Sequence, residues 1–300
     1  MKILITGANG LLGQKLQTVL TGEIYDLYCT DLQDSSVLQQ DSPYYKLNLI
    51  DKSSTTDLIE SLSPDIIIHT AAMTDVDGCE LNKEDCWKIN VGTTENIVNV
   101  AVKTESKLIF MSTDYIFDGE MGPYNEDALP SPISYYGRSK LAAENSIRGS
   151  ELEWCILRTI ILYGTGVNIK SSFVSWLLSQ LRQNKAVRIV NDQWGNTTLV
   201  DDLALAIDRI IILEKTGIFN AAGMGYMSRY EFAQEIAAYF ELDGSLISAI
   251  STEQLGQPAK RPLKSGLITT KAERELFLAF RTVNESLRVY KEQEKHFTVI

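Results

Sequence analysis

The sequence predicts an α/β protein in which a doubly wound parallel sheet carries a smaller α/β lobe. Two observations in the first 160 residues support this fold. Short runs rich in β-branched residues alternate with amphipathic stretches, and a glycine-rich turn joins the first run to the first amphipathic stretch. Alternation of this kind builds a parallel sheet with right-handed crossovers and helices on both faces.

The predicted strands of the sheet are five near-continuous apolar runs, as is typical of parallel strands buried on both faces. They are KILIT (2–6), IYDLYCT (24–30), DIIIHTA (65–71), KLIFMST (107–113) and WCILRT (154–159). Between these strands the residue pattern predicts four helices, over 11–21, 52–62, 90–104 and 134–148.

The alternation becomes irregular after residue 160. The pattern there predicts helices over 171–183, 201–214 and 228–240 and a strand over 217–223. Ser228 with Glu231 three residues later is a capping box, which marks the start of the last of these helices. Because the chain contains no repeat, low-complexity tract or Pro/Ser-rich linker, we expect the second lobe to be built from insertions and the C-terminal tail.

Composition and charge exclude several classes of protein. The chain has 300 residues and a net charge of −11 without a basic stretch to offset it, which argues against a nucleic-acid binder. Its apolar runs are far shorter than the ~20 residues of a membrane span, and the N-terminus does not read as a signal peptide. The four cysteines lack metal-site or C-x-x-C spacing. We therefore expect a soluble, cytoplasmic protein with reduced thiols and no metal.

The glycine-rich turn TGANGLLGQKL places glycines at 7, 10 and 13. Glycines at such a turn let a pyrophosphate approach the N-terminus of the following helix, where unpaired N–H groups favour anions. The spacing G-x-x-G-x-x-G differs from the common fingerprint G-x-G-x-x-G. The turn therefore predicts a Rossmann-type dinucleotide site, and the alternative is a glycine-rich turn without a ligand.

Asp31 ends the second predicted strand, about 20 residues after the glycines, where a ribose partner is expected. A carboxylate accepts hydrogen bonds from both ribose hydroxyls but repels a 2′-phosphate. No Lys or Arg lies between Lys15 and Lys46 to attract that phosphate. On this chemistry alone, the site accommodates NADH better than NADPH. The alternative is that Asp31 is a carboxylate in a turn and binds no ligand.

A reactive pair is predicted on the helix over 134–148. Residues four apart share a helix face, so Tyr136 and Lys140 meet while Tyr135 points elsewhere, packing or lining the cleft. A nearby ammonium favours the phenolate, but lowering a phenol pKa to ~7 requires ~4 kcal/mol. We expect the charge of a cofactor and a dry cleft to contribute the remainder. The alternative is an ordinary surface pair.

Several motifs together resemble those of the extended short-chain dehydrogenase/reductases, and among them those of the dTDP-4-dehydrorhamnose reductase group. The matching segments span nearly the whole chain and are TGANGLLG, AAMTDVDGCE, NVGTTENI, STDYIFDG, YYGRSKLAAE, NDQWGNTT and RPLKSGL. The resemblance implies reduction of the C4 keto group of a nucleotide-activated 4-keto-6-deoxyhexose by NADPH or NADH. It assigns residues 1–160 plus about 190–222 to an NAD(P)-binding domain. It assigns about 161–189 plus 223–300 to a substrate-binding lobe.

The resemblance also implies site residues. Thr113 positions the substrate carbonyl, Tyr136 donates the proton, and Lys140 holds the nicotinamide ribose. The other implied cofactor contacts are Gly7, Asn9, Gly10, Leu11, Gly13, Asp31, Asn48, Leu49, Ala71, Ala72, Thr74, Asn90 and Ser112. The implied substrate contacts are Thr74, Val76, Asp114 and Arg261. The expected partner is the nucleotide sugar, with no nucleic acid and no membrane, and a homodimer is compatible with these features.

Two segments depart from the family pattern. Asn48 replaces an acidic residue near the adenine, and RTIILYG has Ile160 and Ile161 where the family has Ser-Trp, so a stacking surface for the sugar is missing. Two other functions therefore stay open. One is an epimerase of the same superfamily, and the other is a non-catalytic regulatory subunit, such as that of methionine adenosyltransferase. A dehydratase is disfavoured because Thr113 is followed by Asp114 and Tyr115 rather than by an Asp-Glu pair.

The segment PAKRPLKSG (258–266) is the densest basic stretch of the second lobe, with Lys260, Arg261 and Lys264. A diphosphate entering an acidic protein requires local cations. Arginine forms bidentate contacts with phosphate, which makes Arg261 the candidate. The alternative is a solvated charged loop.

Overall fold

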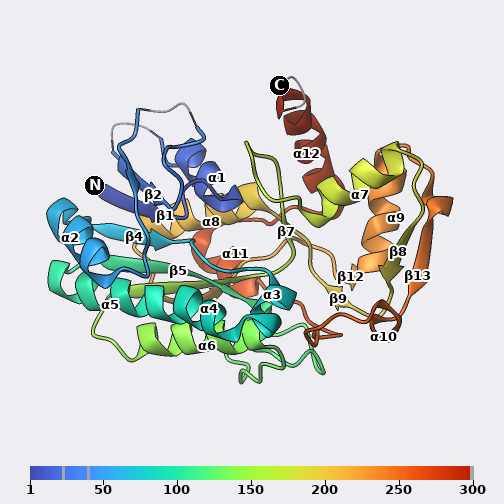
Figure 1. The fold of residues 1–300 in the computed structure, drawn as a ribbon. Coiled ribbons are helices and arrows are strands. Elements are labelled where there is room, and N and C mark those ends of the chain that lie inside the picture. The colour runs from blue at the N-terminus through green and yellow to red at the C-terminus, as the bar shows by residue number, and fades with distance from the viewer. Residues whose placement is uncertain (22–23, 39–40, 298–300) are drawn as a thin grey trace.

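A computed structural model describes residues 1–21, 24–38 and 41–297. Its centre is a parallel sheet of seven strands in the order β11-β6-β5-β4-β1-β2-β3, which confirms the predicted doubly wound fold (Figure 1). The strands are β1 (Lys2–Thr6), β2 (Asp26–Asp31), β3 (Tyr44–Lys46), β4 (Ile66–His69), β5 (Lys107–Thr113), β6 (Trp154–Thr159) and β11 (Gly217–Asn220). In register, Ile5 lies between Cys29 of β2 and Ile68 of β4.

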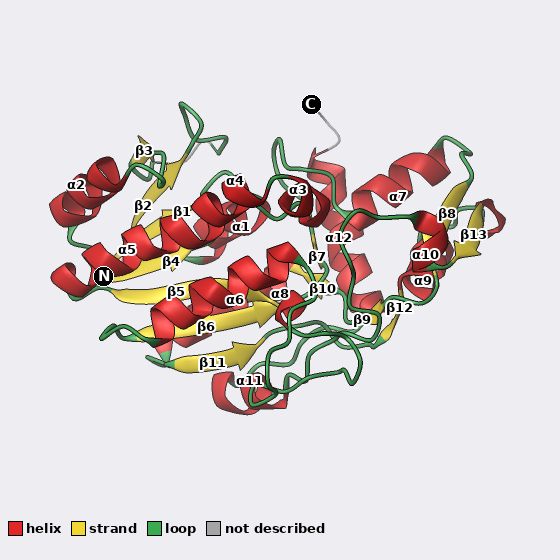
Figure 2. Ribbon diagram, turned by 60° about the horizontal axis from the view of Figure 1, so that its bottom comes forward, coloured by secondary structure: helices red, strands yellow, loops and turns green. Residues whose placement is uncertain are grey.

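Helices cover both faces of this sheet (Figure 2). One face packs against α1 (Leu11–Val19), α8 (Val200–Ile212) and α11 (Thr270–Leu276). The other packs against α2 (Lys52–Leu62), α5 (Thr93–Thr104) and α6 (Tyr135–Arg148). The sheet strands are buried between these layers, so their near-continuous apolar sequences follow from burial on both faces.

The predicted elements differ from the observed ones mainly at their ends and in polar segments. The helix predicted over 90–104 is α5 preceded by a π-helical turn, Lys88–Gly92, which continues from α4 (Lys83–Trp87). A further short helix, α3 (Val76–Leu81), follows β4. Sequence analysis did not identify β3, because Tyr-Tyr-Lys is neither apolar nor long enough to produce a strand pattern.

The second lobe has its own hydrophobic core. Its helices are α7 (Phe173–Arg182), α9 (Arg229–Tyr239), α10 (Thr252–Leu255) and α12 (Val283–Phe297). Its short strands are β7 (Leu162–Tyr163), β8 (Val187–Val190), β9 (Trp194–Gly195), β10 (Thr198–Leu199), β12 (Met227–Ser228) and β13 (Ile247–Ile250). The predicted capping box is confirmed, because Ser228 Oγ accepts from Glu231 N at 3.1 Å and Glu231 Oε2 accepts from Ser228 N at 2.8 Å.

Two parts of the predicted division into lobes differ from the structure. β9 and β10 fall within the stretch predicted for the first domain, about 190–222, but pack with the second lobe. Part of the C-terminal tail does the reverse. Ala272, Leu276 and Phe280 are buried in the core on the α1/α8 face of the sheet, so this stretch packs with the first lobe. The tail reaches that face before it returns to the second lobe as α12. Sequence order alone does not reveal such a return, and residues 298–300 of the predicted second lobe lie outside the described residues.

A buried ion pair joins α6 to β6. Arg158 Nε and Nη2 contact the two carboxylate oxygens of Glu144 at 3.0 and 2.8 Å, and the side chains are 1% and 0% exposed. Such a bidentate pair fixes α6 against the sheet, because both charges lose water and each depends on the other. This places the residues at the start of α6 relative to the end of β5.

Replacing Glu144 with alanine is expected to destabilise the protein by about 3 kcal/mol, because it leaves the Arg158 guanidinium buried and unpaired. Urea unfolding monitored by circular dichroism measures this loss. The matched control is Glu60→Ala, which removes the exposed pair with Lys103 and is expected to cost less than about 1 kcal/mol. Equal losses in the two variants would contradict the assignment.

No helix in the described ranges is long and apolar enough to cross a bilayer. All four cysteines are buried and free, as predicted for reduced thiols in apolar packing. Cys79 and Cys86 pack against Tyr136, and Cys29 and Cys155 lie in the core of the sheet.

Candidate active site

The glycine-rich loop connects β1 to α1 as predicted. Gly7 has φ +71°, and a Cβ on it would lie 2.8 Å from the backbone N of Ala71, so only glycine fits. A Cβ on Gly13 would lie 2.2 Å from the carbonyl oxygen of Gly7, which explains the third glycine as helix–loop packing. Gly10 is exposed and caps α1 without a side-chain hydrogen bond. Leu11, the first residue of α1, is partly exposed, and the next two residues are buried.

Asp31 lies at the carboxyl end of β2, next to the glycine-rich loop. Its Oδ2 accepts from Asn9 N at 3.0 Å, and its Oδ1 accepts from Leu32 N at 2.7 Å. The Asn9 side chain turns away into the 33–37 loop, where Nδ2 donates to Gln33 and Oδ1 accepts from Val37 N. The Asn9 side chain therefore organises this loop, and the contact of Asn9 with a cofactor stays a prediction.

Asn90 is also a structural clamp. Its Oδ1 accepts from Met73 N at 2.8 Å, while its Nδ2 donates to Met73 O at 3.1 Å and to Ser139 Oγ at 3.0 Å. Asn90 thereby ties the segment after β4, which contains Ala71 and Ala72, to helix α6. These partners engage both polar atoms of its side chain, and its direct contact with a cofactor stays a prediction.

The other predicted cofactor and substrate contacts that follow β3 and β4 differ in their exposure to solvent. Leu49 is buried in the core beside α2 and α5, and its contact with a cofactor stays a prediction. Asn48 is exposed, and its Oδ1 accepts from Ile50 N at 3.1 Å. Thr74 is exposed and Val76 is partly buried, and both lie where the chain leaves β4 and enters α3.

Helix α6 begins so that Tyr136 lies beside Thr113. Ser134 caps the helix by accepting from Gly137 N at 3.1 Å, and a Cβ on Gly137 would lie 2.1 Å from the carbonyl oxygen of Tyr115. Gly137 therefore permits the close approach of α6 to the turn after β5. Tyr135 turns the other way and packs beside Trp87, at 6.2 Å between ring centroids.

The environment of Tyr136 keeps its phenol protonated. Burial raises the pKa of Tyr136 above its ordinary value, and a hydrogen bond with Thr113 acts in the opposite direction. The expectation that the pocket lowers this pKa is wrong for the protein alone, because loss of water disfavours the phenolate. A protonated phenol beside a threonine hydroxyl can donate both a proton and a hydrogen bond to a carbonyl oxygen.

Lys140 lies one helical turn further along the same face and is 3% exposed. Burial lowers its pKa to about 7, and the nearby Glu144 carboxylate partly opposes this shift. Its Nζ lies 3.9 Å from the ring centroid of Phe110 and makes no hydrogen bond or ion pair with any described residue. The donors of Lys140 are thus available to a ligand at the carboxyl end of β5. Nearby, Ser112 Oγ is buried and has no partner in the described structure.

Asp114 joins the two lobes next to Thr113. Its Oδ1 accepts from Thr113 Oγ1 at 3.1 Å, and its Oδ2 accepts from Ser265 Oγ at 2.5 Å. Burial raises the pKa of Asp114 to about 6. Because both oxygens are used within the protein, Asp114 holds Thr113 and the 258–266 loop in place. Its role as a substrate contact stays a prediction.

The isoleucines that replace the family Ser-Trp pair lie at the lobe boundary. Ile160 is buried, and Ile161 is partly exposed with φ +42°, a backbone conformation that strains a β-branched residue. Ile161 packs beside Ile116, Phe117 and Leu267. The surface near the predicted sugar site is therefore aliphatic at this position.

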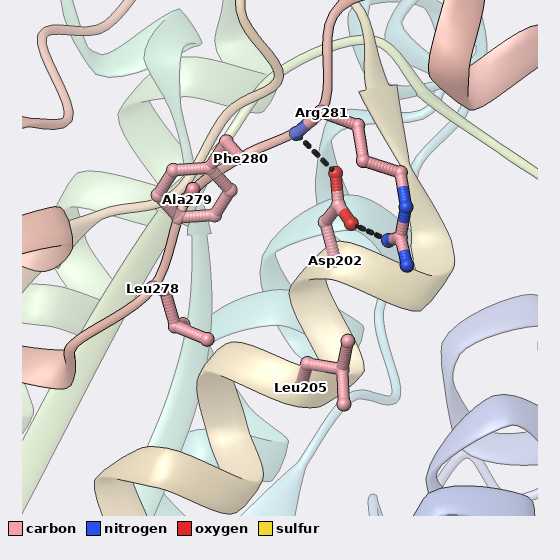
Figure 3. A pocket seen from close by; sticks show the side chains of 6 residues that line it. All are labelled: Asp202, Leu205, Leu278, Ala279, Phe280 and Arg281. Carbon is pink, nitrogen blue, oxygen red and sulfur yellow. Dashed lines mark hydrogen bonds and ion pairs between the residues drawn. The ribbon is translucent and has the colours of Figure 1, made fainter.

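Sequence analysis did not identify Gly137, Ser139, Tyr115 or Arg229 as parts of this region. The Y-G-x-x-K spacing could have indicated Gly137, whereas the others required the tertiary structure. A pocket between α8 and residues 278–281 lies apart from all the predicted site residues (Figure 3). Asp202 and Arg281 form an ion pair across it, which attaches the C-terminal segment to α8. No group of three or more potential metal ligands occurs among the described residues.

Comparisons with known proteins show the family and the fold. The RmlD substrate-binding domain family matches residues 1–295. dTDP-4-dehydrorhamnose reductase of Aggregatibacter actinomycetemcomitans is 31% identical over 91% of this chain and 92% of that protein. Methionine adenosyltransferase 2 subunit beta of Rattus norvegicus is 30% identical over 91% of this chain and 81% of that subunit. The structure of dTDP-4-dehydrorhamnose reductase from Bacillus anthracis, solved with NADP, has a TM-score of 0.88 at 30% identity, covering 97% and 99% of the two chains.

The sheet order, the glycine-rich loop and the Thr–Tyr–Lys set define the class of extended short-chain dehydrogenase/reductase-like proteins. Within that class, the chain belongs to the RmlD substrate-binding domain family. Its relatives include dTDP-4-dehydrorhamnose reductases.

Proposed function

We propose that this protein reduces the C4 keto group of a nucleotide-activated 4-keto-6-deoxyhexose, with NADPH or NADH as cofactor. The observation that carries the proposal is the buried, protonated Tyr136 beside Thr113, with the unpaired Lys140 one turn away. Ligands of doubly wound sheets bind at the carboxyl ends of the strands, where these three residues lie.

The residues of the first lobe fit a dinucleotide. Gly10 leaves the N-terminus of α1 uncapped by a side chain, which suits a pyrophosphate. The partly buried Ala71 and Ala72 leave room for a flat group, and Ser112 Oγ is a buried polar atom without a protein partner. The nicotinamide, when bound, supplies the hydride.

The chain's own residues supply orientation and the proton. The Thr113 hydroxyl donates its single proton to Asp114 Oδ1 in the ligand-free structure and turns it to the carbonyl oxygen when the substrate binds. Tyr136 transfers its phenolic proton to that oxygen as it becomes an alcohol. Lys140 binds the ribose hydroxyls with its free donors. Loss of the proton leaves a phenolate, which the positive charge of Lys140 stabilises.

A substrate panel tests the proposal. Purified protein is mixed with dTDP-, UDP- and GDP-linked 4-keto-6-deoxy sugars and either NADPH or NADH, and cofactor oxidation is followed by absorbance. Consumption of cofactor with formation of a C4 alcohol supports the proposal. Tightly retained NAD with interconversion of sugar epimers favours an epimerase instead. Cofactor binding without turnover of any sugar favours a non-catalytic subunit, a reading that the methionine adenosyltransferase relative keeps open.

Asp31 is expected to disfavour NADPH. Replacing it with alanine and Leu32 with arginine should raise the ratio of kcat/KM for NADPH to that for NADH by about tenfold or more, since a carboxylate is exchanged for a cation beside the 2′-position. Asp34→Ala, which removes an exposed carboxylate paired with Lys46 on the same loop, serves as the control. A strong preference of the unmodified protein for NADPH would show that Asp31 does not face the ribose.

A further inference from the structure

The guanidinium of Arg261, the candidate for binding the substrate diphosphate, already has protein partners. Its Nη2 forms an ion pair with Asp77 at 2.9 Å, and its Nη1 donates to the Ala259 carbonyl oxygen at 3.1 Å. Asp77 also accepts from Ala259 N at 3.0 Å. Arg261 therefore connects the 258–266 loop to α3. The two other cations of that loop, Lys260 and Lys264, are exposed to solvent.

A second arginine lies next to this loop and has no such partner. Arg229 is the first residue of α9, directly after β12, and β12 pairs with β9 through Ser228 and Trp194. On its other side Trp194 binds the basic loop, accepting from Ser265 N at 3.0 Å. Ser265 in turn bonds to Asp114, so these contacts bring Arg229 to the boundary between the lobes near Thr113.

The charge of Arg229 is poorly compensated within the protein. It is partly buried, and its guanidinium forms no hydrogen bond or ion pair in the part of the chain that the structure describes. Its Cζ lies 5.4 Å from the centroid of the Phe173 ring. Burial lowers its pKa, Tyr115 and Asp114 oppose that shift, and the nearby Arg261 adds to it. A cation at the first position of a helix is also disfavoured by the helix dipole.

We propose that Arg229 binds the phosphoryl group attached directly to the sugar of the nucleotide-sugar substrate. The assignment rests on the proposed function. A phosphoryl oxygen pair satisfies the planar donors of a guanidinium. A bound phosphoryl group would also offset the repulsion between the positive charges of Arg229 and Arg261. This explains why two guanidiniums lie near each other although only Arg261 has a carboxylate partner.

The position of Arg229 selects this phosphoryl group rather than one in the cofactor. The ring of Tyr115 lies 5.6 Å from that of Tyr136, and Arg229 is a charged neighbour of Tyr115 and Asp114 on the second-lobe side. In a hexose the C1 oxygen lies across the ring from C4. A sugar with C4 at Tyr136 therefore extends its C1 phosphate away from Tyr136 toward the second lobe. The glycine-rich loop, which suits the cofactor pyrophosphate, belongs to the first lobe.

Calorimetric titration of the NADPH-saturated protein tests the assignment, with dTDP-glucose, UDP-glucose and inorganic pyrophosphate as probes. None of these probes carries a C4 keto group, so binding is measured without turnover. Arg229→Gln is expected to weaken binding of the preferred nucleotide sugar by about tenfold or more, as expected for a lost charge-assisted contact. Arg229→Lys should retain part of the affinity, and NADPH affinity should be unchanged. Arg188→Gln, which removes an exposed arginine on β8, is the matched control and should bind as the unmodified protein does.

The outcomes separate this assignment from the proposed function. If the unmodified protein reduces a 4-keto sugar but Arg229→Gln has the same affinity and KM, then the assignment is wrong and the function stands. If no nucleotide sugar binds or reacts, but pyrophosphate binds only when Arg229 is present, then the function is wrong and Arg229 is still an anion site. If none of the three probes binds to the unmodified protein, the assignment is wrong. Thermal melting of each variant shows whether it is folded.

Discussion

Tyr136→Phe is expected to lower kcat for the keto sugar by about 10²–10⁴, the usual effect of removing an acid–base group. The substitution removes only the phenolic oxygen, so the ring keeps its contacts with Cys79, Cys86 and Tyr115. Cofactor affinity and melting temperature should therefore change little. Steady-state kinetics and fluorescence titration of NADPH measure the two quantities.

The neighbouring tyrosine provides the control for this experiment. Tyr135→Phe removes the same atom from the adjacent residue, whose ring packs beside Trp87 rather than Tyr136. We expect its kcat to stay within about twofold of the unmodified protein, because its hydroxyl does not take part in proton transfer. Similar losses in both variants, or a normal rate in Tyr136→Phe, would mean that another group donates the proton.

Lys140→Met is expected to lower kcat/KM by about 10³ and to weaken cofactor binding as well, since Lys140 is proposed to bind the ribose and to stabilise the phenolate. The two effects are measured separately, by single-turnover rates and by titration of NADPH. Lys103→Met, at an exposed lysine of α5, is the control. A change in only one of the two quantities would disprove the dual role.

Lys140→Met can also be tested by its thermal stability, which does not depend on activity. Burial lowers the pKa of Lys140 to about 7, below its value in the unfolded chain. The charged side chain therefore destabilises the cofactor-free folded state most below pH 7, and this penalty falls as the pH rises from about 7 toward 10.5. Lys140→Met should accordingly melt above the unmodified protein at pH 6, with a smaller difference at pH 9. A difference that grows with pH would contradict the burial of the charge.

Local sequence patterns were sufficient to predict the fold and to place Tyr136 and Lys140 on one face of a helix. The ends of β1, β5, β6 and α2 agree with their predicted residues, because an uninterrupted apolar run or a helical period is encoded within each segment. The pairing of Tyr136 with Lys140 follows from the helical repeat in the same way. The steric constraint on Gly13 comes from the turn itself, whereas Gly7 is also confined by Ala71, which follows β4.

The roles of polar side chains could not be predicted in this way. Asn9 and Asn90 have residue types that suit cofactor contacts, yet their polar atoms are used by the 33–37 loop, Met73 and Ser139. The direction of the Tyr136 pKa shift also depended on burial rather than on the neighbouring lysine. In each case the hydrogen-bond partners and the degree of burial come from other parts of the chain.

The sequence by itself determined the doubly wound sheet, the glycine-rich loop and the Thr113, Tyr136 and Lys140 set. Only the tertiary structure decided which arginine has a carboxylate partner. Arg261 is engaged because Asp77, on a helix of the other lobe, reaches it and also binds Ala259, 182 residues away along the chain. The periodicity of a helix or strand is a short-range property of the chain. The compensation of a buried charge depends on every group that folding brings within a few ångströms of it.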